Sequence, residues 1–273
     1  MPELPEVETV RRTLKRQILN EEFKEVFVYY PNIIEEPDVD TFKKELIGQT
    51  IIDMDRKGKW LIFVLNDYLL LTHLRMEGKF FLRKHSDELA KHEHVAFLFK
   101  SGLELRYNDT RKFGRMYLLD KNKAYDMKPL NELGLEPWDK NLTSTYLLDK
   151  YKNKKLPIKT VILDQSIIVG IGNIYADEIL YKSKINPLKE SNKLTKKDCE
   201  EIIKNTKIIL ENAIKLGGTT IRSYESSEGV HGRFQHNLEC HNHEGDPCPK
   251  CSTKITKIRV GGRGTYFCPK CQK

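Results

Sequence analysis

The stretch CPKC at residues 248–251, repeated as CPKC at residues 268–271, governs how the C-terminal tail folds. Two Cys-x-x-Cys pairs at this separation match a tetrahedral zinc site with four thiolate ligands. The tail from about residue 239 is too rich in Cys, Gly and Lys to build an apolar core, so it needs a metal site to hold its fold. A cytosolic setting disfavours disulfides, and the missing βαβ pattern disfavours a redox pair. We therefore predict one structural zinc ion, bound by Cys248, Cys251, Cys268 and Cys271.

The run between the two cysteine pairs predicts a hairpin with a basic tip. Residues 257–267 alternate basic and apolar side chains around Gly261 and Gly262. A glycine pair suits a tight hairpin turn. A zinc-stapled ribbon would be rigid and would present Arg263 at its tip. Such a tip fits a groove of a nucleic acid.

Upstream of the tail the chain reads as mostly helical. Thr195 and Asp198 have the spacing of a helix-capping pair. An apolar stripe follows from Ile202 to Ile214, and the glycines at residues 217–218 end it. We expect a long helix there. Residues 121–145 are polar and interrupted by prolines, which suits a linker.

The N-terminal part changes from a helical to a strand pattern. One stripe of an amphipathic helix is formed by Val7, Val10, Leu14 and Ile18. From about residue 23 to 119, short runs of Val, Ile, Phe, Tyr and Leu alternate with turn signals. Their spacing suits an antiparallel sandwich or barrel. The chain is therefore expected to be α+β.

Charge favours a polyanionic partner without identifying it. The 273 residues include 47 Lys and Arg against 39 Asp and Glu, a net charge of +8. Residues 151–160 and 250–273 carry basic residues and no acid, which predicts a cationic surface on the C-terminal half. A solvated lysine-rich face explains the same composition equally well.

Membrane and secreted classes do not fit. No apolar run approaches the roughly 20 residues of a membrane span. The acidic, proline-bearing start also lacks the basic leader of a secretory signal. We expect a cytosolic globular protein.

The first residues have two interpretations. Removal of Met1 would give Pro2 a free secondary amine, which can attack a sugar aldehyde carbon and form an iminium electron sink. Glu3 and Glu6 lie within one helical turn and could act as the accompanying acid. Proline and acids are also what the first turn of an ordinary helix selects. Taken alone, these residues favour that structural explanation.

A series of motifs favours the catalytic interpretation of the N-terminus. Together these motifs resemble the formamidopyrimidine-DNA glycosylases, the bacterial enzymes that repair 8-oxoguanine. The motifs are PELPEVETVRR at 2–12, KGKWL at 57–61, HLRMEG at 73–78, KHEH at 91–94, DTRKFG at 109–114, GIGNIYADE at 170–178 and the terminal cysteine pairs. Each motif alone is weak. Their order and spacing over essentially the whole chain are specific.

The resemblance implies an N-terminal helix on a β-sandwich, then a helix-two-turns-helix domain carrying the four-cysteine zinc finger. On that basis the domains are 1–120 for the helix and β-sandwich, 121–145 for the linker, 146–238 for the helix-two-turns-helix DNA-binding domain and 239–273 for the zinc finger. It also implies a monomer that binds damaged double-stranded DNA, without membrane association, in the bacterial cytoplasm where the nucleoid lies.

The implied activity is that of a bifunctional DNA glycosylase and abasic-site lyase in base excision repair. A damaged purine is flipped out of the duplex, Pro2 displaces it through a Schiff base, and β,δ-elimination cuts the strand. By the family pattern Glu3 is the proton donor, Lys59 supports β-elimination and Arg263 supports δ-elimination. Lys59 offers a compact charge on a long stem, whereas Arg263 can fork onto a phosphate.

The resemblance also assigns DNA contacts. The positions that match are His92, Arg111, Lys155 and Asn173 for binding, and Met76, Arg111 and Phe113 for the wedge that fills the gap left by the flipped base. In isolation, Met76 and Phe113 would pass for strand-face packing. His241 departs from the pattern, because it stands where the family typically has a phosphate-contacting tyrosine. That contact would then depend on pH.

Two other functions remain as alternatives. Endonuclease VIII shares the implied fold, the Pro2 chemistry and the zinc finger but removes oxidised pyrimidines. A non-catalytic zinc-ribbon protein that binds nucleic acid would explain the charge and the cysteines, but not the N-terminal motif. The Ser- and Gly-rich segment 217–235 is the candidate for a mobile lid over the lesion.

Overall fold

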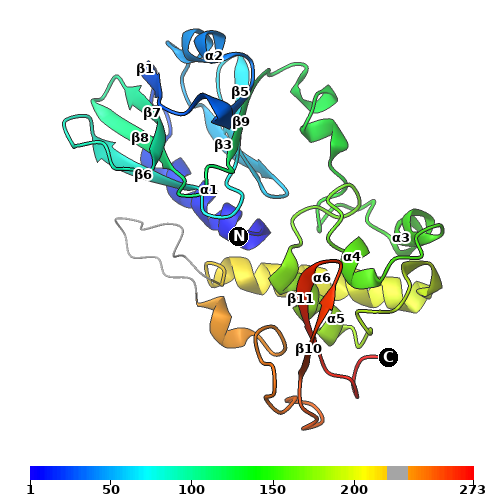
Figure 1. The fold of residues 1–273 in the computed structure, drawn as a ribbon. Helices are drawn as coiled ribbons and strands as arrows, with labels where there is room; N and C mark the ends of the chain where they lie inside the picture. The colour runs from blue at the N-terminus through cyan, green and yellow to red at the C-terminus, as the bar shows by residue number, and fades with distance from the viewer. Residues whose placement is uncertain (220–232) are drawn as a thin grey trace. The chain divides into compact units, whose positions relative to one another are not determined.

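The computed structural model describes residues 1–219 and 233–273, which fall into two compact units (Figure 1). The first unit contains Met1–Pro2 and Glu6–Glu132. The second contains Glu3–Pro5, Leu133–Thr219 and residues 233–273. Most of the segment 217–235, the expected lid, lies outside the described residues.

The chain opens with helix α1 (Leu4–Ile18), as the apolar period predicts. The whole predicted stripe is buried in the core of the first unit, namely Val7, Val10, Leu14 and Ile18. The helix begins before the stripe does, and its first residue Leu4 is buried in the core of the second unit.

The predicted strand region forms two sheets that pack face to face (Figure 1). The first sheet is antiparallel and consists, in order, of β1 (Phe23–Val28), β7 (Glu93–Phe99), β8 (Leu103–Asn108) and β6 (Lys79–Lys84). The second consists, in order, of β2 (Ile34–Glu36), β9 (Arg115–Asp120), β5 (Tyr68–His73), β4 (Trp60–Val64) and β3 (Asp53–Lys57). Phe63 and Phe80, one from each sheet, have ring centroids 5.6 Å apart. The sandwich prediction is confirmed.

A short helix in this unit was not predicted from the sequence. Helix α2 (Val39–Leu46) begins at Asp38, whose carboxylate accepts the N–H groups of Asp40 and Thr41. Its residues Phe42 and Leu46 are fully buried. The capping aspartate was the signal that a local analysis could have used.

Two loops pass between the sheets at the same end of the sandwich. The loop 74–78 joins β5 to β6, and the loop 109–114 joins β8 to β9. Strand register brings their ends together, because His73 pairs with Arg115 and Lys79 pairs with Asn108. Segments far apart in sequence therefore become neighbours.

The second unit is helical, as predicted. Its helices are α3 (Ser144–Tyr151), α4 (Ile158–Val161), α5 (Asn173–Lys182) and α6 (Lys196–Lys215). Helix α6 begins with the predicted capping box of Thr195 and Asp198. Among the described residues, the 3-10 turns are η1 (Pro31–Ile33), η2 (Ala124–Asp126) and η3 (Leu130–Glu132) in the first unit, and η4 (Ser191–Lys193) and η5 (Phe234–Asn237) in the second. Within residues 1–219 and 233–273, no helix is long and apolar enough to cross a membrane.

The predicted hairpin lies near the C-terminus. Strands β10 (Thr256–Val260) and β11 (Arg263–Phe267) pair antiparallel, with Val260 opposite Arg263. The two turn glycines, Gly261 and Gly262, have φ values of 55° and 78°. Positive φ at both central residues is what a type I′ turn requires, so glycine is needed there.

Candidate active site

Glu3 is bound by the N-terminus of α5. Its carboxylate accepts the backbone N–H groups of Gly172 at 2.6 Å, Ile174 at 2.9 Å and Tyr175 at 3.4 Å. Glu3 is only 2% exposed. The first N–H groups of a helix have no partner within the helix, and the helix dipole is positive at that end. The site is therefore built to hold a carboxylate anion.

The glycines of the motif at residues 170–173 make room for the first residues of the chain. A Cβ atom on Gly172 would lie 2.3 Å from Cδ of Glu3, and one on Gly170 would lie 2.4 Å from Cδ1 of Leu4. The N–H of Leu4 also donates to the carbonyl of Gly170 at 3.1 Å. Two motifs that are 169 residues apart in the sequence, at Glu3 and Gly172, thus form one site, which no local pattern reveals.

Pro2 and Lys59 belong to the first unit. Pro2 is buried, and Met1 before it is 44% exposed. Lys59 lies in the turn between β3 and β4 and is 7% exposed.

Burial, together with the charges of Arg75 and Lys59, lowers the pKa of His73 to about 3. His73 is therefore neutral at pH 7.

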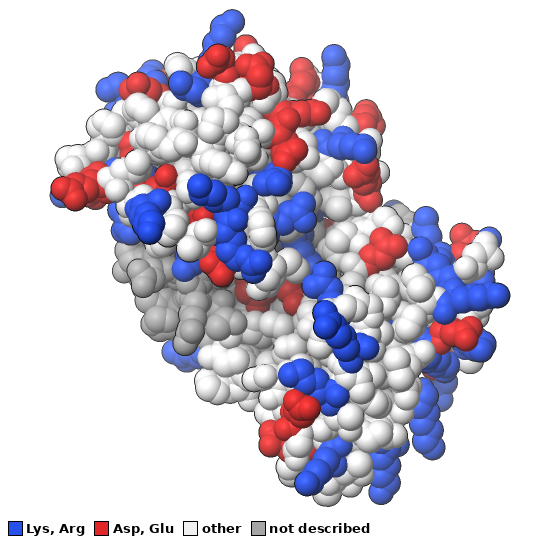
Figure 2. All heavy atoms as spheres, viewed as in Figure 1, with Lys and Arg blue, Asp and Glu red and all other residues white. Residues whose placement is uncertain are grey.

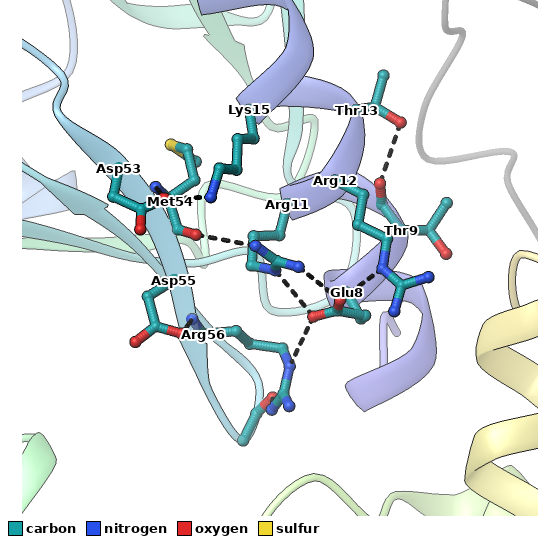
Figure 3. A network of polar contacts seen from close by, with 11 residues as sticks. Glu8, Thr9, Arg11, Arg12, Thr13, Lys15, Asp53, Met54, Asp55 and Arg56 are labelled. Atoms are coloured by element: carbon teal, nitrogen blue, oxygen red, sulfur yellow. Dashed lines mark hydrogen bonds and ion pairs between the residues drawn. The ribbon is translucent and has the colours of Figure 1, made fainter. Parts of the chain in front are cut away.

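A cluster of ionic side chains fixes α1 on the sheet beneath it (Figure 3). The carboxylate of Glu8 accepts hydrogen bonds from Arg11 at 2.8 Å and Arg12 at 2.7 Å, and Arg56 of β3 lies 3.4 Å away. Arg11 also donates to the carbonyl of Met54 at 2.9 Å. Burial alone would raise the pKa of Glu8, but these arginines lower it to about 2. This part of the N-terminal motif is structural.

The three residues predicted to form the wedge, Met76, Arg111 and Phe113, lie on the two loops between the sheets. Met76 is 40% exposed and Phe113 is 45% exposed, so neither packs on a strand face. The guanidinium of Arg111 lies 4.7 Å from the centroid of the Phe113 ring. His92 is half-buried just before β7. Its carbonyl accepts the N–H of Asp109 at 3.0 Å, which connects it to the same loop.

Asn173 connects α5 to the hairpin. Its side-chain amide donates to the carbonyl of Gly264 at 3.0 Å, next to Arg263. Arg263 itself is exposed at the tip, as predicted. One end of α5 thus holds Glu3, Asn173 and the strand that carries Arg263. Lys155 is exposed in the segment between α3 and α4.

The prediction of a cationic surface over residues 151–160 is wrong for Lys159. Lys159 is fully buried, and its Nζ binds the carboxylate of Asp177 at 2.6 Å and the carbonyl of Asn173 at 2.9 Å. The other oxygen of Asp177 lies 2.6 Å from Nδ1 of His241. A buried ammonium needs an anionic partner, and only the fold supplies one here. Figure 2 shows basic side chains spread over the visible face, with acidic ones among them.

A second acid of α5 organises the entry to the zinc finger. Glu178 is buried, and its carboxylate accepts the N–H groups of three consecutive residues, Glu239, Cys240 and His241. Sequence analysis missed both Asp177 and Glu178 as anchors. Their place in the motif at residues 170–178 was the available signal.

The four predicted ligand cysteines converge. Their sulfur atoms all lie within 4.8 Å of one another, with Cys248 Sγ 3.9 Å from Cys271 Sγ and Cys251 Sγ 3.5 Å from Cys268 Sγ. Tetrahedral Zn–S bonds of about 2.3 Å require sulfur atoms about 3.8 Å apart. The four cysteines are free thiols and fit the ion. The predicted structural zinc site is confirmed.

Comparison with protein families covers most of the chain. Residues 1–116 match the formamidopyrimidine-DNA glycosylase N-terminal domain, and residues 133–225 match the formamidopyrimidine-DNA glycosylase H2TH domain. Residues 245–273 match the zinc finger found in FPG and IleRS.

Relatives and solved structures agree with these matches. A formamidopyrimidine-DNA glycosylase of Oceanobacillus iheyensis is 48% identical and covers 100% of this chain and 98% of its own. One of Lactobacillus helveticus is 46% identical, over 100% and 99%. A complex of a Lactococcus lactis FPG mutant with Fapy-dG-containing DNA has a TM-score of 0.93 at 38% identity, covering 100% of both chains. MutM bound to carbocyclic 8-oxo-G DNA has a TM-score of 0.92 at 37% identity, also covering 100% of both.

These matches extend over the full chain at identities well above those at which only a fold is shared. They agree with the motif order in the sequence, with the sandwich and helical units, and with the four-cysteine cluster. The chain belongs to the formamidopyrimidine-DNA glycosylase family.

Proposed function

We propose that this protein excises oxidised purines, namely 8-oxoguanine and formamidopyrimidines, from duplex DNA and then cuts the strand at the abasic site. Pro2 is the nucleophile and Glu3 is its proton-transfer partner. The observation that carries the proposal is the cradle of three N–H groups that holds the Glu3 carboxylate directly after Pro2 in the chain. The names of the relatives support the choice of substrate.

The first step joins Pro2 to the sugar. Once Met1 is removed, the secondary amine of Pro2 attacks the C1′ atom, and the damaged base leaves with the electron pair of the glycosidic bond. Glu3 is held as a carboxylate, so it accepts the proton that the Pro2 nitrogen loses. It then delivers that proton to the ring oxygen as the sugar opens. The product is a cationic iminium between Pro2 and the sugar.

The second step breaks the strand. The iminium acidifies the neighbouring C2′ proton, and its loss expels the 3′ phosphate; a further elimination expels the 5′ phosphate. Lys59 assists the first elimination as a compact ammonium. Arg263 assists the second, because an exposed guanidinium at a hairpin tip can bind a phosphate through two N–H groups.

DNA is held by contacts from both units. His92, Arg111, Lys155 and Asn173 are assigned to phosphates and bases, and Met76, Arg111 and Phe113 to the gap left by the flipped purine. The side chain of Asn173 already donates one amide hydrogen to Gly264, so its second hydrogen is the one offered to DNA. The protein acts as a monomer on nucleoid DNA in the bacterial cytoplasm.

Borohydride trapping tests the nucleophile. We expect purified protein that begins at Pro2 to form a covalent adduct with duplex DNA containing 8-oxoguanine. Protein that retains Met1, and the variant Pro2→Gly, should give little or none. Pro5→Gly is the matched control, because it changes a proline of the same segment and leaves the terminal amine intact.

Mass spectrometry of each preparation establishes its N-terminus. Equal adduct yield from protein that retains Met1 would contradict the role of Pro2. Preferential release of thymine glycol over 8-oxoguanine would instead assign the protein to the oxidised-pyrimidine activity of endonuclease VIII.

A further inference from the structure

We propose that Asp109, together with Tyr107, is a positioning residue that holds the DNA wedge in its working shape before DNA binds. This inference rests on the proposed roles of Met76, Arg111 and Phe113. Neither Asp109 nor Tyr107 touches DNA in this scheme. They act through the loops 74–78 and 109–114, which the strand register places side by side.

Asp109 uses nearly all of its polar groups on the wedge loop and its surroundings. It is fully buried. Its Oδ1 atom accepts the N–H of Arg111 at 3.0 Å, and its Oδ2 atom accepts those of Phe113 at 2.9 Å and Gly114 at 2.8 Å. Both oxygens of one carboxylate therefore set the backbone on which Arg111 and Phe113 stand.

The backbone of Asp109 extends this network. Its N–H donates to the carbonyl of His92 at 3.0 Å, and its own carbonyl accepts the N–H of Lys112 at 3.2 Å. The Nε2 atom of His94 lies 2.9 Å from the same carbonyl. The segment that carries His92 and the loop that carries Arg111 are thus tied at one residue.

Tyr107 connects the loop 74–78, which carries Met76, to the loop 109–114. Its hydroxyl donates to Oδ2 of Asp109 at 3.4 Å, and its side chain is fully buried. A Cβ atom on Gly114 would lie 1.8 Å from the Tyr107 hydroxyl, and one on Gly78 would lie 2.3 Å from it. Gly78 closes the turn of Met76 by donating its N–H to the carbonyl of Leu74 at 2.9 Å. Both loops therefore rest against one phenol oxygen.

This arrangement meets a physical need. Exposed side chains on loops are ordinarily mobile, and ordering them costs conformational entropy. A wedge that must enter the base stack during flipping works best when that cost is met during folding. The exposed faces of Met76 and Phe113 remain available because the ordering is done from beneath, by buried groups.

The variant Asp109→Asn removes part of this hydrogen-bond network and changes the shape of the side chain little. An amide has one oxygen, so in either orientation its NH2 group faces a backbone N–H that the carboxylate formerly accepted. We expect excision of 8-oxoguanine from duplex DNA to slow on the order of tenfold to a hundredfold. Cleavage of a single-stranded abasic oligonucleotide, where there is no gap to fill, should change less than about twofold.

A spectroscopic signal reports the wedge directly. The fluorescence of 2-aminopurine placed beside the lesion rises when the stack opens, and Asp109→Asn should slow this rise by the same factor as excision. The matched control is Asp120→Asn, an aspartate at the end of β9 whose carboxylate accepts only the N–H of Asn122 among the described residues, at 2.9 Å. It should leave both rates unchanged.

Two further variants keep the test decisive. Tyr107→Phe removes the shared hydroxyl and should slow the fluorescence rise about threefold, with folding verified by thermal unfolding. If Asp109→Asn does not fold, Tyr107→Phe provides the test in its place.

Phe113→Ala should slow the rise at least as much as Asp109→Asn. If Phe113→Ala is impaired while Asp109→Asn and Tyr107→Phe flip the lesion normally, the inference is overturned and the proposed function stands. If Phe113→Ala is also normal, the wedge assignment fails, and the inference with it.

Discussion

Asp109 in the first unit and Glu3 in the second are both buried carboxylates that accept backbone N–H groups. Asp109 belongs to the loop whose N–H groups it binds, so its hydrogen bonds close a local structure. Glu3 instead binds N–H groups of a helix that is remote in sequence, and it directly follows the proposed nucleophile. In the proposed scheme, the same interaction shapes a DNA-contacting surface in one unit and holds a reactive group in the other. Burial and hydrogen bonding alone therefore do not distinguish the proposed positioning acid from the proposed catalytic one.

Glu3→Gln should have the largest effect of the substitutions, and it tests whether Glu3 differs from Asp109 in function. The amide keeps the shape of Glu3 but cannot carry a proton between the Pro2 nitrogen and the sugar, so base release should fall about a hundredfold to ten-thousandfold. Single-turnover release of 8-oxoguanine measures this. Glu6→Gln, a change of a buried acid in the first turn of α1, is the control and should remain active.

The outcome separates the two kinds of acid. Glu3 would be a positioning residue like Asp109 if Glu3→Gln slowed excision only in duplex DNA and left the lyase activity on single-stranded abasic DNA intact.

Removal of zinc should affect the two units differently. The hairpin depends on the four thiolates, so chelation should lower the affinity for lesion DNA by on the order of a hundredfold. The sandwich has its own apolar core, so the fluorescence of Trp60 should stay native. Cys248→Ser should reproduce the loss of binding. Cys199→Ala, a change of a buried cysteine in α6, should not. Unfolding of both units on chelation would refute this independence.

Acid should weaken the first unit through Glu8. Its pKa is about 2 in the folded protein against an ordinary 4.5, so its ionised form stabilises the unit fully above pH 4.5 and loses this effect as the pH falls through 2. The shift corresponds to at most about 3 kcal/mol. Glu8→Gln should therefore lower the free energy of unfolding most at pH 7 and much less at pH 3. Urea titration followed by Trp60 fluorescence, in a Trp138→Phe background, measures this.

The control for that titration is Glu25→Gln, which changes an exposed acid on β1. It should leave the free energy of unfolding almost unchanged at both pH values. A loss of stability from Glu8→Gln that is the same at pH 3 and pH 7 would show that packing, and not charge, is what Glu8 provides.

Lys155→Ala should give the smallest effect. One exposed ammonium that neutralises a phosphate contributes about 0.9 to the slope of log affinity against log salt, and its loss should weaken binding a few-fold. Lys152→Ala is the matched control, because Lys152 is exposed but already paired with Asp149 at 2.7 Å. Fluorescence anisotropy at several salt concentrations compares them. Identical slopes for the two variants would remove Lys155 from the DNA-binding residues.

Local features were predictable to the residue. The stripe of α1, the capping box of α6 and the glycine turn before Arg263 all appear where the sequence places them. Each depends on side chains within a few positions of one another, and helical or strand periodicity encodes such relations directly. The zinc ligands were equally accessible, because each Cys-x-x-Cys pair is itself a local geometry.

The site was only partly predictable. The family resemblance assigned roles to Glu3 and Arg263. No local pattern indicated that the N-terminus of α5 binds Glu3, or that Asn173 holds the strand beside Arg263. Lys159 was assigned to a cationic surface, although it is buried against Asp177. A lysine run looks the same in sequence whether its members face water or a carboxylate.

Spacing along the chain thus specified the first helix, the long helix α6, the strand-rich region, the zinc ligands and the family. The packing of distant segments set which acids became anchors and which lysine became buried, and it placed Gly78 and Gly114 against Tyr107. The reason is physical: a hydrogen bond or a burial cost depends on which distant groups arrive at the same place, and that meeting is set by packing of the whole unit.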